Sequence, residues 1–293
     1  MKRKCICCNQ QNHDVLWNDK IRTGKKSFSK NKTKLIICES CGLISLKEKK
    51  KKLENSSIAR NLYNKDNSIK EFIKFHKPRE IKKIKFIEKF FNFEGKKVLE
   101  SNCGAGILIN YLKKKTLCTA GLDDRLYQTH VKKNGHIFFS SIDEIKNAKK
   151  KFDVILSLSE LEHKFNPYIF LKKIKKTLNK GGHLIIRIPN YKNIYMFLLG
   201  YNFLRYDFRS SHNYYFSENN LDLLFSKLNL KIIQKLGMNE YNFNHLLTYL
   251  DTGRRVRINK IKKFVNNRRD NQIVANIEKN MISTSLLYIL SKQ

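Results

Sequence analysis

The chain has 293 residues, of which 41% are hydrophobic and 29% charged, and its net charge is +35 at pH 7. This size allows one large domain or two smaller ones, and no apolar stretch is long enough to span a bilayer, which excludes a helical membrane protein. Residues 1–5 lack the apolar run of a signal peptide, so we expect a cytoplasmic protein whose thiols stay reduced.

The positive charge has two interpretations. Lysine outnumbers arginine and basic residues occur in nearly every segment, which favours a general compositional bias over one binding surface. Two denser groups are the run at 47–52 and a set in the last forty residues: Arg254, Arg255, Arg257, Lys260, Lys262, Lys263, Arg268 and Arg269. Nucleic acid, whose phosphates attract such groups, is therefore the less favoured partner.

Residues 1–46 contain two C-x-x-C pairs: Cys5, Cys8, Cys38 and Cys41. In a reducing compartment this spacing favours metal ligation over disulfides. Four thiolates complete a tetrahedral zinc site with no open position, so we expect a structural zinc module. Cys7 and His13 are alternative ligands, and cysteines that only pack are the alternative without a metal. Apolar residues on both sides of the second pair predict a hairpin.

Residues 47–95 form a predicted linker and helical lead-in. The lysine run at 47–52 is typical of a solvated segment. Apolar residues then recur at helical spacing on both sides of Pro78, which we expect to interrupt the helix: Ile69, Phe72 and Ile73 before it, and Ile84, Ile87 and Phe91 after it.

Residues 96–293 alternate strands with helices. We predict helices at 107–114, 167–178 and 221–228, a turn at 180–182, and strands at 97–100, 118–123, 136–139, 152–157, 183–188, 231–236 and 284–290. Apolar strands separated by helices indicate an α/β fold of the Rossmann-like, doubly wound type, with a mostly parallel seven-stranded sheet.

Residues 190–216 form an aromatic insertion without a regular period. It follows the carboxyl end of a predicted strand, where ligands bind in parallel sheets, which predicts a substrate lid. The alternative is an insertion that packs over the edge of the sheet.

The first strand of this domain runs into the turn Glu-Ser-Asn-Cys-Gly-Ala-Gly at 100–106. A dinucleotide turn needs a third glycine, where Ile109 stands here. The Glu100 carboxylate would repel a pyrophosphate and favours a cationic ligand. Asp123 ends the next strand and can accept hydrogen bonds from ribose hydroxyls. These charges favour S-adenosylmethionine, which has a sulfonium and an amino group, over NAD.

Residues 97–190 resemble class I S-adenosylmethionine-dependent methyltransferases in successive motifs at 98–106, 121–123, 152–155, 161–167 and 178–190. The resemblance implies cofactor contacts from Glu100, Asn102, Gly104, Gly106 and Asp123, with Ser141 and Ile142 beside the adenine. Asn102 replaces a glycine of the family's turn, but asparagine tolerates the left-handed conformation. Ser159 replaces the first glutamate of a magnesium-binding Glu-x-x-Glu-His motif found in some relatives, so that metal triad is not expected.

The cysteine module followed by this core is similar to a bacterial group that includes sugar C-methyltransferases and surface-glycan methyltransferases. The likeness extends to Tyr63 and to residues 211–217. It implies methyl transfer to a small-molecule acceptor, a sugar or nucleotide-linked sugar. An RNA methyltransferase and a non-catalytic binding protein with a degenerate cofactor turn are the alternatives.

Methyl transfer requires the protein to orient the acceptor and, where needed, to remove its proton. His163 follows the fourth strand of the domain and His212 ends the aromatic insertion, and either can be the catalytic base. The alternative for each is a structural histidine bound to backbone. Glu160 and Glu162 are candidates for a base or for a residue that orients it.

Overall fold

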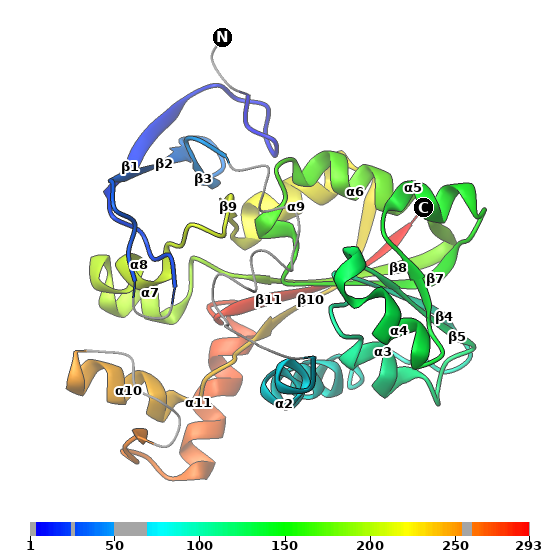
Figure 1. Ribbon diagram of the computed structural model, residues 1–293. Coiled ribbons are helices and arrows are strands. Elements are labelled where there is room, and N and C mark those ends of the chain that lie inside the picture. Colours follow the sequence, from blue (N-terminus) through cyan, green and yellow to red (C-terminus); the bar gives the residue numbers. More distant parts are fainter. Residues whose placement is uncertain (1–3, 25–26, 50–68, 254–259, 293) are drawn as a thin grey trace.

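A computed structural model describes residues 4–24, 27–49, 69–253 and 260–292. Its centre is a seven-stranded sheet in the order β10-β11-β8-β7-β4-β5-β6 (Figure 1). The strands are β4 (Lys97–Ser101), β5 (Cys118–Leu122), β6 (Ile137–Phe139), β7 (Phe152–Leu158), β8 (Leu178–Pro189), β10 (Leu230–Met238) and β11 (Ser285–Lys292). Neighbours from β8 to β6 are parallel, and β11 is antiparallel to both β8 and β10. The mostly parallel, Rossmann-like sheet predicted from the sequence is confirmed.

Helices cover both faces of this sheet, as the uninterrupted apolar strands require. One face packs against α5 (Ile142–Asn147), α6 (Pro167–Lys175) and α9 (Glu218–Lys227), and the other against α2 (Ile69–Ile87), α3 (Ile107–Leu112) and α4 (Gln128–Lys133) (Figure 1). Successive residues of a strand point to opposite faces. Leu99 therefore joins the first core, and Val98 joins the second.

Two expectations about chain breaks were wrong. Helix α2 continues through Pro78, which is exposed and costs the helix one backbone hydrogen bond, while Phe72 and Ile84 on either side are buried. Packing of the apolar face outweighs that loss. The predicted turn at 180–182 is an irregularity inside β8, where Gly181 has a φ of +71° and the register with β7 shifts.

The cysteine segment forms a second, smaller sheet in the order β1-β2-β3-β9. Its strands are β1 (His13–Asp19), β2 (Thr33–Cys38) and β3 (Ile44–Leu46), which confirms the predicted hairpin. The fourth strand, β9 (Tyr214–Tyr215), comes from the aromatic segment and pairs with β3 (Figure 1). This pairing was not predicted, because it joins residues about 170 positions apart in the sequence.

The rest of the aromatic segment folds into α7 (Ile194–Leu199) and α8 (Tyr201–Asp207). Tyr191 and Phe208 pack with Trp17 and Ile44 of the small sheet, so the segment shares a core with the cysteine module. Two further helices, α10 (Phe243–Thr252) and α11 (Asn267–Lys279), were not predicted. Helix α10 packs on α7 through Leu246 and Tyr195.

Candidate functional site

The turn after β4 keeps the left-handed backbone that close approach of a ligand needs. Its three residues with positive φ are Asn102 (65°), Gly104 (53°) and Gly106 (73°). Glycine reaches this region without steric cost, and asparagine is the residue type that tolerates it best after glycine. The expectation that Asn102 accepts the conformation of the glycine it replaces is therefore confirmed.

Two buried carboxylates flank this turn. Glu100 lies in β4 and Asp123 follows β5, the parallel neighbour of β4, so both reach the same edge of the sheet. Asp123 accepts hydrogen bonds from the backbone N–H of Gly104, at 2.6 Å, and of Asp124, at 2.8 Å. The pair makes this edge negative, which fits a cationic ligand and opposes a pyrophosphate.

Gly121 of β5 makes room for the turn. A Cβ added to Gly121 would lie 2.5 Å from Cys103 Sγ, because the thiol of the turn packs directly against this strand. We expect Gly121→Ala to lower the free energy of unfolding by about 1–3 kcal/mol, the usual cost of overpacking. Chemical denaturation measures this loss. The double variant Gly121→Ala/Cys103→Ala should recover part of it, and a purely additive double variant would contradict the packing argument.

Ser141 and Ile142, the residues predicted to lie beside the adenine, follow β6, the strand next to β5. They begin α5, directly after β6, whose Phe139 pairs with Leu122 of β5. Ser141 caps the helix by accepting a hydrogen bond from the N–H of Glu144, at 3.2 Å. Ile142 is half-buried.

The two histidines predicted as alternative bases lie together. The centroids of the His163 and His212 rings are 4.9 Å apart, with an interplanar angle of 82°. His163 belongs to η3 (Leu161–His163), which follows β7 at the carboxyl edge of the sheet. Its Nδ1–H donates to the carbonyl oxygen of Ser211, at 2.5 Å, so Nε2 keeps its lone pair. This is the tautomer that a proton acceptor at Nε2 needs.

Burial keeps both imidazoles neutral near pH 7. It lowers the pKa of His163, against a smaller opposing effect of the Glu162 carboxylate. It also lowers the pKa of His212 well below its ordinary value, and the positive charge of Arg209 adds to the effect. A neutral imidazole can accept a proton, so the pair has the protonation state of a base.

Glu162 completes a cluster with the two histidines. One ligand atom from each of the three residues lies within 4.8 Å of the others, and Glu162 Oε1 is 3.9 Å from His163 Nε2. Within the described residues, the buried Oε2 of Glu162 accepts no hydrogen bond. Such a set can hold a metal, but the charges of Arg209, Arg22 and Arg187 act on His212 and oppose a divalent cation. We therefore interpret the cluster as an acid–base site and not as a metal site.

The Glu160 carboxylate, by contrast, bonds to residues that have no predicted catalytic role. Its carboxylate accepts hydrogen bonds from Ser101 Oγ, at 3.0 Å, and Ser157 Oγ, at 2.7 Å, and pairs with Lys164 at 2.8 Å. These contacts tie the ends of β4 and β7 together. Of the two glutamates considered from the sequence, Glu162 is the one beside the histidines.

Comparison with known proteins decides the family. A family model described as "Methyltransferase domain" matches residues 74–235, which is more than half of the chain. The chain belongs to this family of methyltransferase domains. The negative edge formed by Glu100 and Asp123 fits a cationic ligand.

Curated relatives match part of the chain. The ubiquinone biosynthesis O-methyltransferase of Hydrogenovibrio crunogenus is 29% identical over 139 residues, which are 44% of this chain and 56% of that protein. The Brucella ovis protein of the same name is 27% identical over 159 residues, which are 50% of this chain and 64% of that protein. The chain thus spans between half and two thirds of the length of these relatives.

Solved structures share the fold. A methyltransferase from Haloferax volcanii, in complex with the Trm112 methyltransferase activator, gives a TM-score of 0.52 at 13% identity, over 74% of this chain and 92% of that one. A SAM-dependent methyltransferase from Archaeoglobus fulgidus gives a TM-score of 0.50 at 17% identity, over 75% of this chain and 99% of that one.

The four cysteines of the two pairs lie close together in the structure. Their sulfur atoms lie within 4.8 Å of one another, with Cys5 Sγ 3.6 Å from Cys41 Sγ and Cys8 Sγ 3.5 Å from Cys38 Sγ. A tetrahedral zinc with Zn–S bonds of about 2.3 Å separates its sulfur ligands by about 3.8 Å, so the four residues fit this ion.

The backbone around the two pairs repeats one turn. The N–H of Asn9 donates to Cys5 O and the N–H of Gly42 donates to Cys38 O, and both donors have positive φ, 64° and 73°. Two equal turns that bring their cysteines together are typical of a zinc knuckle. Cys7 is buried nearby, and His13 bonds to Gln11 O; neither is part of the four-sulfur cluster.

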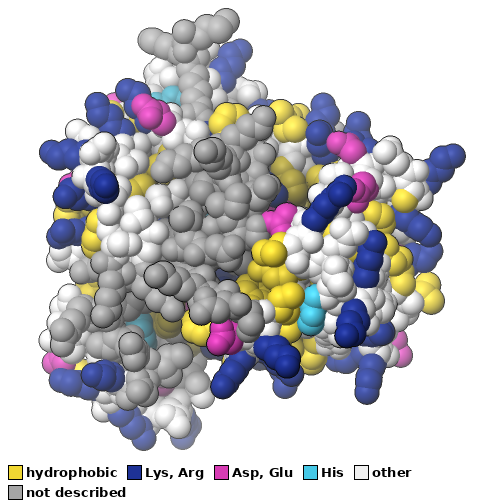
Figure 2. Space-filling view, in the orientation of Figure 1, with side chains coloured by type: hydrophobic (Ala, Val, Ile, Leu, Met, Phe, Trp, Pro, Cys, Tyr) yellow, Lys and Arg dark blue, Asp and Glu magenta, His cyan; other side chains and the backbone are white. Residues whose placement is uncertain are grey.

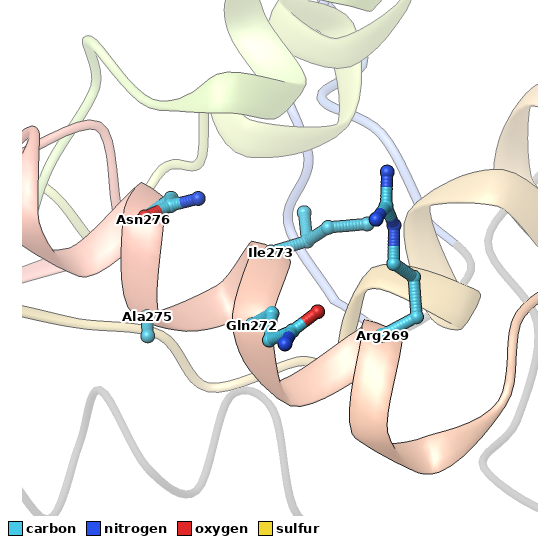
Figure 3. A pocket seen from close by; sticks show the side chains of 5 residues that line it. All are labelled: Arg269, Gln272, Ile273, Ala275 and Asn276. Carbon is cyan, nitrogen blue, oxygen red and sulfur yellow. The ribbon is translucent and has the colours of Figure 1, made fainter.

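The basic residues form no single patch on the face shown in Figure 2, where lysine and arginine side chains are scattered between other types. Of the C-terminal basic set, Arg254, Arg255 and Arg257 lie outside the described residues, as do Tyr63 and Lys50 to Lys52 of the earlier predictions. A hollow along α11 is lined by Arg269, Gln272, Ile273, Ala275 and Asn276 (Figure 3). It contains none of the predicted site residues. No described helix is long and apolar enough to cross a membrane.

Proposed function

We propose that the methyltransferase transfers a methyl group to a hydroxyl of a small-molecule acceptor, a sugar or nucleotide-linked sugar. The observation that supports it is the pair of neutral imidazoles, His163 and His212, at the carboxyl edge of the sheet that also contains the cofactor turn. The four-cysteine module supports a sugar-type acceptor through the group it resembles. The names of the two curated relatives support transfer to oxygen.

We propose that Glu100 and Asp123 bind the cofactor through its amino and ribose groups, while Asn102, Gly104 and Gly106 let the backbone approach it. Ser141 and Ile142 would flank the adenine. The bound cofactor supplies an activated methyl group. His163 Nε2 would remove the acceptor's hydroxyl proton as the hydroxyl oxygen accepts the methyl group. The Ser211 carbonyl fixes the His163 tautomer, and Glu162 stabilises the imidazolium that results.

We further propose that zinc bound by Cys5, Cys8, Cys38 and Cys41 has a structural role, because four thiolates leave no position for a substrate. Residues 1–46 would then be the zinc module, 47–95 the linker and helical lead-in, and 96–293 the catalytic domain with its insertion at 190–216. The antiparallel pairing of β3 with β9 fixes the module to this insertion.

An acceptor panel tests the proposed function. The purified protein is incubated with labelled S-adenosylmethionine and, separately, with nucleotide-linked sugars, phenolic ubiquinone precursors and a structured RNA. We expect label only in the sugars, attached through an ether oxygen as shown by mass spectrometry and NMR. Methylation of the phenols alone would show that the acceptor is not a sugar, but it would agree with the proposed methyl transfer to a hydroxyl oxygen. Methylation of RNA alone, at a rate that falls steeply with salt, would overturn both.

A further inference from the structure

Asn213 connects the cysteine module to the histidine pair. Its side chain is fully buried, at 0% exposure. Its backbone N–H donates to Glu162 O at 2.8 Å, and its Nδ2 donates to His163 O at 2.9 Å. Its own carbonyl accepts a hydrogen bond from the N–H of Leu46, at 3.0 Å. Asn213 therefore bonds to the backbone of Leu46 at the end of β3 and to the backbones of Glu162 and His163.

The residues on either side of Asn213 extend this connection. Before it, the carbonyl of Ser211 accepts the hydrogen bond from His163 Nδ1 that sets the tautomer. After it, Tyr214 pairs with Ser45 of β3, and its hydroxyl donates to Phe165 O at 3.2 Å. The segment that contains His212 is thus held by β3 on one side and by η3 on the other.

Strand β3 is in turn tied to the cysteine cluster. It begins three residues after Cys41, and the left-handed turn at Gly42 directs the chain into it. The hydroxyl of Tyr191 donates to Gly42 O at 2.8 Å, which fixes this turn to the catalytic domain. A change in the geometry of the four cysteines would therefore move β3, and with it the backbone that holds Asn213.

We propose that Asn213 is a positioning residue and that the metal-supported module, acting through β3 and Asn213, sets the orientation of His163 and His212. The zinc module is then a component of the acceptor site. This inference rests on the proposed function of the histidine pair, but it concerns how the pair is held.

The test compares Asn213→Ala with a matched control, Asn220→Ala. Asn220 is equally buried, at 0% exposure, and among the described residues its side chain bonds to Ser217, within the cap of α9. We expect Asn213→Ala to lower kcat about tenfold, as small displacements of catalytic groups do, with calorimetric binding of S-adenosylhomocysteine unchanged. We expect the imidazole resonances of His163 to shift in spectra of ¹⁵N-histidine-labelled protein. Asn220→Ala should change neither kcat nor these resonances.

Two further measurements complete the test. Asn213→Leu keeps much of the size and the backbone bonds but has no side-chain donor for His163 O, so it should reproduce the resonance shift if the alanine variant fails to fold. Removal of zinc from the 293-residue protein should shift the same resonances while S-adenosylhomocysteine binding persists. Unchanged His163 resonances in the variants and after zinc removal would overturn the inference. If the His163 resonances shift but turnover is unchanged, the module still orients the two histidines. The catalytic role proposed for the pair would then be wrong.

Discussion

Replacing His163 with glutamine is expected to lower kcat by about 10²–10⁴-fold, the usual contribution of a general base. Glutamine keeps much of the size of the ring but cannot accept a proton at neutral pH. S-adenosylhomocysteine should still bind, because the cofactor turn after β4 is separate from η3. Steady-state kinetics with the acceptor found in the panel, together with calorimetry, measures the two effects.

His183→Gln is the control for this variant. His183 lies in β8 and packs against the Phe91 ring, away from the pair, and burial also lowers the pKa of its imidazole. It should keep normal turnover. If His212→Gln is inactive while His163→Gln is active, the base is His212, and full turnover in both variants would show that neither is.

The pH dependence of kcat follows from the direction of the His163 shift. Burial lowers its pKa from 6.5, so the base stays neutral at pH values where an exposed histidine would be protonated. Activity should therefore be constant around neutral pH and fall only as the pH drops below 6.5. The same groups lower stability in acid, because the unfolded chain binds protons that the buried imidazoles do not.

Loss of the metal is the second change with a large expected effect. Cys8→Ser or Cys38→Ser should abolish stoichiometric zinc binding and lower the free energy of unfolding by several kcal/mol. Structural zinc contributes about 10–16 kcal/mol of apparent binding energy in zinc-finger peptides, which is an upper bound here. The packed core shared with Trp17 and Phe208 retains part of the module's stability. Metal analysis by mass spectrometry and thermal unfolding measure both effects.

Cys7→Ser is the matched control, since Cys7 is buried beside the cluster but outside it. It should bind one zinc per chain as the unaltered protein does. A Cys7 variant without zinc, or a Cys8 variant with full zinc, would show that the ligand set is wrong.

Local sequence signals predicted the catalytic fold because each strand is specified by its own residues. The apolar run at 152–157 and the cofactor turn at 100–106 contain their information within a few positions. The helix break predicted at Pro78 was wrong, because packing of the helix face on the sheet outweighs the backbone hydrogen bond that proline removes. Helix α11 was missed because its sequence is polar and it buries only Asp270 and Ile277 among its described residues.

The histidine pair was predicted residue by residue but not as a pair. Nothing near His163 or His212 in the sequence indicates that the two rings lie 4.9 Å apart, because their proximity depends on β9 pairing with β3. Asn213 was missed for the same reason. Its importance lies in three hydrogen bonds to residues far away in the sequence, and asparagine in the motif at 211–217 otherwise looks like a turn residue.

The position of β11 has a consequence for how the chain folds during synthesis. This strand is the last in chain order, yet it lies inside the sheet, between β8 and β10. Strand β10 does not pair with β8, so it cannot join the sheet until residues 285–292 are free of the ribosome and have paired with β8. Until then its backbone groups and one apolar edge of β8 stay exposed, and we expect chaperones that recognise such edges to bind the nascent chain at this stage.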